Sequence, residues 1–165
     1  MIDKEKEISG TLRIASIPDF KKRLEKLIKW YEIELKKLNI ELKLGVELTP
    51  DLVNEIKPDI VIIATGSKPI IPRIPGIENA VIANDVLIGK VSVGNKVIVV
   101  GGGLVGCETA LHLAKQGKDV TIIEALPDIA LGEPFINRLA IMKLLKKYNV
   151  KLLTRNPVVE IKRER

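Results

Sequence analysis

The chain has 165 residues, of which 46% are hydrophobic, 29% charged and 3% aromatic. This length allows one medium domain with its own core, or parts of two larger domains. The composition excludes intrinsic disorder. The longest apolar stretch, residues 97–107, is far shorter than the roughly 20 residues that cross a membrane, and residues 1–7 are too charged to begin a secretory signal. We therefore expect a cytoplasmic protein without a membrane partner.

The net charge of +6 is spread along the chain, with five basic and two acidic residues in the last fifteen. Elsewhere Lys and Glu alternate as they do on solvated helix faces, whereas nucleic-acid binders gather basic residues with aromatic ones on one face. We therefore predict no nucleic-acid partner. Cys107 and His112 are the only residues of their types. They exclude an internal disulfide and argue against a protein-ligated zinc site, so we expect no metal site.

The first 64 residues contain four predicted elements. Apolar residues three or four positions apart predict an amphipathic helix over residues 18–38. Residues 40–44 alternate as in a short strand, and Thr49 or Asp51 can cap a short helix after it. The continuous β-branched run at residues 59–64 is typical of a strand buried on both faces of a parallel sheet.

The next segment changes character, because residues 65–76 contain prolines at 69, 72 and 75 and two glycines. This composition predicts an extended connector. The proline spacing also fits a ligand of SH3-type domains, but a stiff linker between domains is the plainer interpretation. A helical piece near residues 85–88 and a turn at residues 94–95 follow it.

The remaining residues alternate between strand and helix signals. The predicted strands are 96–100, 119–124, 150–154 and the start of one at 158–163, and the predicted helices are 104–116, closed by Gly117, and 133–148. A strand–helix–strand–helix–strand order is that of the first half of a Rossmann fold. We therefore predict an α/β fold with a Rossmann-like parallel sheet.

Gly101, Gly103 and Gly106 form a G-x-G-x-x-G motif between the first of these strands and its helix. In such a motif the first glycine permits the tight turn, the second lets a pyrophosphate approach the backbone, and the third lets helix and strand approach closely. The helix N-terminus offers unpaired N–H groups to phosphates. The alternative is a tight turn without a ligand. The predicted binding loop consists of Gly101, Gly102, Gly103, Leu104, Val105 and Gly106.

Two acidic residues accompany this motif. Glu124 stands 18 residues beyond Gly106 at the tip of the next strand, where a carboxylate accepts hydrogen bonds from the adenosine ribose. Because no arginine stands beside Glu124 in the chain, we predict NAD(H) rather than NADP(H). The plainer interpretation of Glu124 is a solvated residue at the end of a strand. Glu108 can complement the helix dipole or face the nicotinamide, and its spacing favours neither role.

The segment Ala64-Thr65-Gly66-Ser67, the prolines after it and the glycine motif together resemble flavoproteins that pair FAD- and NAD(P)-binding Rossmann domains. The resemblance implies that Ala64, Thr65 and Gly66 close an FAD domain against the flavin nucleotide. It also implies that the proline-rich segment crosses into the NAD domain. Residues 106–110 match a Gly-x-Glu-x-Ala pattern of the family, which implies that Glu108 lies near the nicotinamide.

Within this group, residues 12–18 and the helix after them are similar to the C-terminal region of 2-enoate and 2,4-dienoyl-CoA reductases. These are NADH:flavin oxidoreductases. The resemblance implies that NADH passes hydride to FAD, and that electrons continue through an iron–sulfur cluster to FMN and reduce an activated C=C bond. This chain carries neither the cluster cysteines nor an FMN barrel. We expect no catalytic residue in it and no turnover by the chain alone.

The expected organisation is that of a fragment. Residues 1–76 would be the second half of an FAD-binding domain, residues 77–95 a connector, and residues 96–165 the first half of an NAD(H)-binding domain. Its expected partners are NADH, a flavin, the other parts of the same enzyme, and further copies that meet it at exposed sheet edges. The alternatives are a non-catalytic NAD- or ADP-binding regulatory module, or a fragment of another paired-domain reductase such as an NADH oxidase or a glutamate-synthase-like enzyme.

Overall fold

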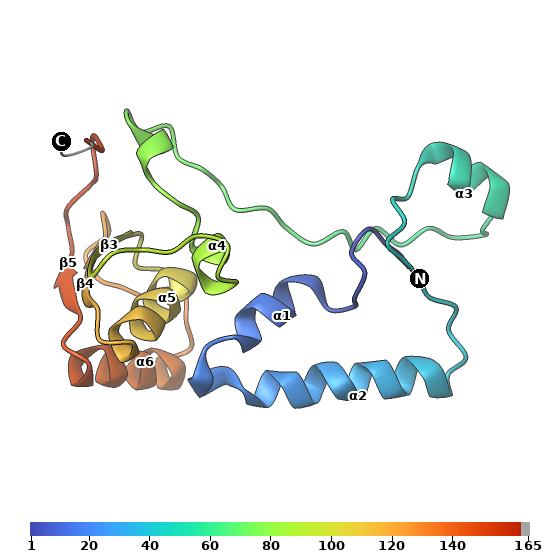
Figure 1. Cartoon of the computed structure of the whole chain (residues 1–165), viewed down its shortest axis with the longest axis horizontal. Coiled ribbons are helices and arrows are strands. Elements are labelled where there is room, and N and C mark those ends of the chain that lie inside the picture. The colour runs from blue at the N-terminus through green and yellow to red at the C-terminus, as the bar shows by residue number, and fades with distance from the viewer. Residues whose placement is uncertain (163–165) are drawn as a thin grey trace. The chain divides into compact units, whose positions relative to one another are not determined.

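The computed structural model describes residues 1–162. The chain forms two compact units, one comprising Met1–Lys68 and the other beginning at Pro69 (Figure 1). Both units contain helices and parallel strand pairs, so the predicted α/β class with a Rossmann-like sheet is confirmed. Among the described residues, no helix has the length and apolar character needed to cross a membrane.

The first unit contains a small parallel pair and three α-helices. Helix α1 packs against α2, and Thr49 caps α3 by accepting a hydrogen bond from the Leu52 N–H at 3.2 Å, as predicted. The helix predicted over residues 18–38 is divided, because Pro18 has extended backbone angles and a 3₁₀ turn precedes α2. The elements are β1 (Ile2–Asp3), α1 (Gly10–Ser16), η1 (Asp19–Lys21), α2 (Arg23–Lys37), β2 (Lys43–Leu44) and α3 (Pro50–Ile56).

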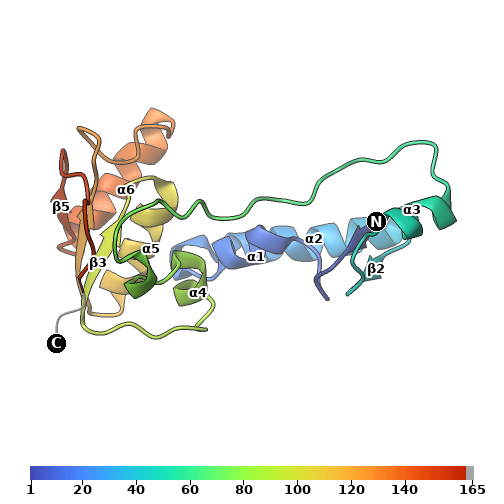
Figure 2. The same cartoon turned by 90° about the horizontal axis from the view of Figure 1, so that it is seen from above.

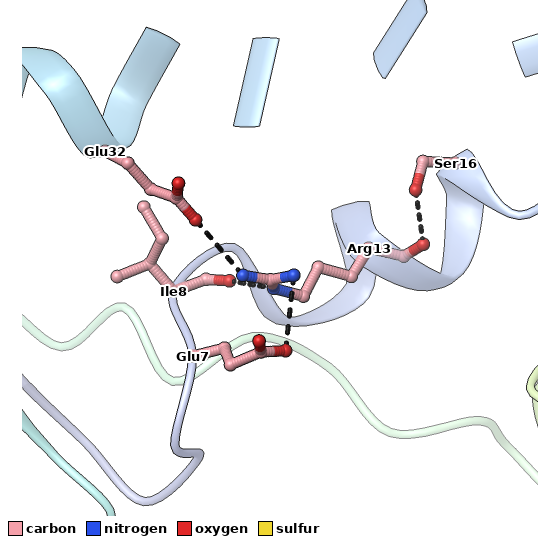
Figure 3. A network of polar contacts seen from close by, with 5 residues as sticks. All are labelled: Glu7, Ile8, Arg13, Ser16 and Glu32. Carbon is pink, nitrogen blue, oxygen red and sulfur yellow. Dashed lines mark hydrogen bonds and ion pairs between the residues drawn. The ribbon is translucent and has the colours of Figure 1, made fainter. Parts of the chain in front are cut away.

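Arg13 links the start of α1 to α2 through its guanidinium group (Figure 3). Its Nε donates to the Ile8 carbonyl at 2.8 Å, and its two terminal nitrogens lie 3.2 Å from carboxylate oxygens of Glu7 and Glu32. The Ser16 hydroxyl donates to the Arg13 carbonyl at 2.7 Å. Because Glu32 belongs to α2, this one side chain joins both helices to the loop before them.

Replacing Arg13 with alanine is therefore expected to lower the free energy of unfolding of this unit by about 1–2 kcal/mol. Arg13→Lys should recover only part of the loss, because an ammonium lacks the planar set of donors that reaches three acceptors. Trp30 is the only tryptophan and lies in α2, so urea unfolding can be followed by its fluorescence. Lys37→Ala removes an exposed ion pair with Glu34 and is the control. Equal losses in the two alanine variants would contradict the role of Arg13.

The prediction of a buried strand at residues 59–64 is wrong. The segment has no strand structure, and its side chains are exposed, with Ile62 86% accessible. A strand needs a neighbouring strand to receive its N–H and C=O groups, and no backbone hydrogen bond among the described residues links this run to another segment. The β-branched composition favours an extended backbone but does not supply the neighbour.

The second unit follows the predicted alternation of strands and helices. Its three strands are parallel in the order β3-β4-β5, with Val97 opposite Val120 and Ile122 opposite Leu152. The predicted strand at 158–163 is absent from residues 158–162, and Arg163 lies outside the described residues. The elements are η2 (Ile77–Asn79), α4 (Ala83–Leu87), β3 (Lys96–Val100), α5 (Leu104–Lys115), β4 (Asp119–Ile123), α6 (Phe135–Lys147) and β5 (Lys151–Leu153).

Both long helices of this unit lie on one face of the sheet (Figure 2). Two right-handed crossovers in the same direction place α5 and α6 on the same side, and they bury Val120 and Ile122 of β4. The opposite face is open, and Ile98 on it is 64% exposed. The strand at residues 96–100 is therefore covered on only one of its two faces. Contact with other parts of the enzyme, or with further copies at exposed sheet edges, stays a prediction.

The end of the proline-rich segment is held within the second unit. The Ile161 N–H donates to the Pro75 carbonyl at 2.9 Å. Gly76 follows with φ near +80°, and a Cβ at this position would lie 1.8 Å from the Ile161 carbonyl oxygen. Glycine is therefore required here both for the backbone angle and for the close approach.

Candidate nucleotide-binding site

The glycine loop joins β3 to α5 at the carboxyl end of the sheet. The Gly101 N–H donates to the Ile123 carbonyl of the neighbouring strand at 2.9 Å, and φ of Gly101 is near +100°. Helix α5 begins with the hydrogen bond from the Cys107 N–H to the Gly103 carbonyl, at 2.9 Å. A strand, a tight glycine turn and a helix N-terminus therefore follow one another directly, which is the context that a phosphate-binding loop needs.

The glycines of the loop are required for different reasons. A Cβ on Gly106 would lie 2.0 Å from the Gly101 carbonyl oxygen, and one on Gly102 would lie 2.5 Å from Cγ2 of Ile129. Gly103 has φ near −68°, and a Cβ built on it would have no atom within 4 Å. Its N–H has no acceptor among residues 1–162. The fold itself therefore requires Gly102 and Gly106, whereas Gly103 leaves open space beside a free donor.

Glu124 holds the glycine loop by its side chain. Its Oε2 accepts from the Gly102 N–H at 2.6 Å, and its Oε1 accepts from the Leu126 N–H at 2.8 Å. The interpretation of Glu124 as a merely solvated strand end does not describe this geometry. An ionised carboxylate has about four acceptor positions, so two remain for further donors such as hydroxyl groups.

The carbonyl oxygen of Gly102 is also held, by two hydrogen bonds. It accepts from the Ala130 N–H at 2.7 Å and from the Cys107 thiol at 3.3 Å. Cys107 is fully buried, and burial, followed by the charge of Glu108, raises the pKa of its thiol to about 11. Cys107 is therefore a packing residue of the core of this unit. Its hydrogen bond to the loop is not visible in any sequence pattern.

The raised pKa of Cys107 predicts an alkaline loss of stability. In the unfolded chain a thiol titrates near pH 8.5, so the unfolded state loses its proton first. The free energy of unfolding should fall as the pH rises from about 8.5 to 11. Urea titrations of wild type and Cys107→Ala across this range test the prediction. The difference in unfolding free energy between wild type and Cys107→Ala should shrink as the pH rises. A difference that stays constant with pH would contradict the prediction.

The loop after β4 is held by an ion pair that the sequence does not reveal. Arg138 of α6 donates from Nε to the Ile129 carbonyl at 3.0 Å and pairs with the Asp128 carboxylate. The Ile129 N–H and the Arg138 guanidinium together hold the pKa of Asp128 below its usual range. These contacts fix Ile129, which packs directly against Gly102.

The structure brings the glycine loop and Glu124 together but not every predicted residue. Leu104 and Val105 form the first turn of α5, and Glu108 lies half-buried one turn further along. The remaining predicted residues belong to the first unit, where they are exposed in irregular backbone without regular structure; they are Ala64, Thr65 and Gly66.

The parallel β-α-β-α-β arrangement with a glycine loop at the end of its first strand defines a Rossmann-like α/β protein. The chain belongs to the pyridine nucleotide-disulphide oxidoreductase family, whose model matches residues 4–165. The family is one of oxidoreductases.

Several known oxidoreductases are similar to this chain. An NADH oxidase of Thermoanaerobacter brockii is 41% identical over 98% of the chain and 26% of its own length. A cinnamate reductase of Clostridium sporogenes is 46% identical over 78% of the chain and 19% of its own length. A solved complex of 2-naphthoyl-CoA reductase with 2-naphthoyl-CoA is 34% identical, with a TM-score of 0.91, over 98% of the chain and 25% of its own. The chain thus spans about a quarter or less of these proteins.

Proposed function

We propose that this chain is the NADH-binding part of a flavoprotein oxidoreductase of the 2-enoate reductase type. The observation that carries the proposal is Gly103, a glycine that the fold does not require, with open space and a free N–H at the start of α5. A residue without a Cβ at this point lets a pyrophosphate reach the backbone.

The residues around the loop fit a dinucleotide. The first N–H groups of α5 have no partners within the helix, and its partial positive charge favours phosphate oxygens. Glu124 is held beside the loop with acceptor positions left over for ribose hydroxyls. In this proposal the loop binds the pyrophosphate, Glu124 orients the adenosine ribose, and Glu108 faces the nicotinamide half.

A flavin is the proposed electron acceptor, which membership of the family supports. The described residues form no enclosed flavin site, because Ala64, Thr65 and Gly66 are exposed. The contribution that we derive for this chain is therefore to bind and orient NADH. In the proposal, FAD, FMN, the iron–sulfur cluster and the C=C substrate are bound with other parts of the enzyme.

Calorimetric titration of the full chain with NADH and with ADP tests the binding proposal. NADH should bind, and Gly103→Ala should weaken it about tenfold or more because the added methyl group meets the pyrophosphate. The same variant should keep the unfolding free energy of the wild type, since its Cβ has no neighbour. Gly94→Ala, also without neighbours, is the matched control. Equal NADH affinity in the two variants would overturn the proposal, and equal affinity of the wild type for NADH and ADP would favour a regulatory module.

A further inference from the structure

The backbone of the loop after β5 pairs with Glu124 and with the segment that follows it, and this loop carries Arg155. The Asn156 N–H donates to the Glu124 carbonyl at 3.0 Å, and the Arg155 N–H donates to the Leu126 carbonyl at 2.9 Å. Residues joined in this way lie about 5 Å apart at their Cα atoms, which is within the length of an arginine side chain. No arginine adjoins Glu124 in the chain, but the pairing of these two loops places the backbone of Arg155 next to Leu126.

Arg155 is available for a ligand, whereas the other arginine near this loop is not. The Arg155 side chain is exposed, and its guanidinium makes no hydrogen bond or ion pair with any of residues 1–162. Arg138 is engaged by Asp128 and by the Ile129 carbonyl. A free guanidinium is well suited to a phosphate group because its donors match phosphate oxygens in a planar fork.

The charge of Glu124 is also partly compensated. Its two oxygens already accept from the N–H groups of Gly102 and Leu126. A bare carboxylate at this place would repel the 2′-phosphate of NADPH, but this one is hydrogen-bonded on both oxygens, and the loop that pairs with the segment after it carries Arg155. Repulsion of a 2′-phosphate is therefore weaker here than the carboxylate alone would impose.

We propose that Arg155 is a specificity-determining residue that lets the site accept a 2′-phosphorylated adenosine, so that the chain binds NADPH as well as NADH. This inference rests on the proposed nucleotide function. Arg155 offsets the charge of Glu124 at the adenosine end of the loop, and the ratio of NADPH to NADH affinity depends on it.

The test compares dissociation constants for NADH and NADPH in the full chain at one fixed salt concentration. Arg155→Asn suits the left-handed backbone of this position, where φ is near +59°, and Arg155→Glu reverses the charge. Lys151→Asn and Lys151→Glu make the same changes at the opposite end of β5, where Lys151 pairs with Asp119. The wild type should bind NADPH within about tenfold of NADH. Arg155→Asn should weaken NADPH about threefold and Arg155→Glu about tenfold, with NADH changed less than about twofold.

The outcomes separate this inference from the proposed function. If the wild type binds neither dinucleotide, the proposed function fails and the inference falls with it. If NADH binds but NADPH does not, the role of Arg155 is overturned while the proposed function stands. The role of Arg155 would also be overturned if Arg155→Glu left the ratio of NADPH to NADH affinity unchanged, or if Lys151→Glu changed that ratio equally.

Discussion

Replacing Gly106 with alanine is expected to lower the free energy of unfolding of the second unit by about 1–3 kcal/mol. The new Cβ would lie 2.0 Å from the Gly101 carbonyl oxygen, which belongs to the backbone and cannot rotate away. To admit the methyl group, α5 must move away from β3, and the loop between them must change shape. NADH binding should be lost together with stability, because the N–H groups of the loop would no longer converge on one position.

Chemical denaturation followed by far-ultraviolet circular dichroism, with NADH titration in native buffer, measures both effects. Gly94→Ala is the control, because its added Cβ has nothing within 4 Å and it lies outside the loop. Gly106→Ala should lose stability and binding, Gly103→Ala binding alone, and Gly94→Ala neither. A Gly106→Ala variant as stable as Gly94→Ala would show that the close approach of helix and strand is not needed.

Replacing Glu124 with alanine is expected to have the second large effect. The N–H groups of Gly102 and Leu126 would lose a charged acceptor, at a cost of about 2 kcal/mol in unfolding free energy. Affinity for NADH should fall about tenfold or more, since the ribose loses its acceptor and the loop its support. Glu124→Gln should be intermediate, because an amide offers one acceptor oxygen where the carboxylate offers two.

Glu160→Ala is the control for this prediction, since it removes an exposed carboxylate of the same unit that pairs only with Lys162 among the described residues. Denaturant unfolding and NADH titration of the three variants give the comparison. If Glu124→Ala were as stable as Glu160→Ala, the two hydrogen bonds from the loops would contribute nothing to the fold. If it also bound NADH normally, Glu124 would have no role in the site.

The sequence predicts the glycine loop well because its requirements are local. Gly101 needs a positive φ, Gly106 must leave room for the preceding turn, and both follow from the order of residues between a strand and a helix. The proximity of Glu124 to the loop is also predictable, because the carboxyl ends of adjacent parallel strands lie side by side.

The error at residues 59–64 and the two arginine contacts that the sequence does not reveal concern segments that are distant in the chain. The run at residues 59–64 has the composition of a buried strand, yet burial depends on a neighbour that its own residues do not specify. Arg138 and Arg155 have no distinctive sequence context, yet Arg138 pairs with Asp128 and the backbone of Arg155 pairs with Leu126, two residues after Glu124. No periodicity or motif carries that information.

The most direct test of the central claim, that the glycine loop binds the dinucleotide, is an amide nuclear magnetic resonance titration of the labelled full chain with NADH. We predict that the largest shifts fall on the N–H groups of Gly103 and the first turn of α5, with smaller shifts at Glu124 and Leu126. Gly103→Ala should abolish them at the same NADH concentration. Shifts confined to other segments, or none at saturating NADH, would contradict the account.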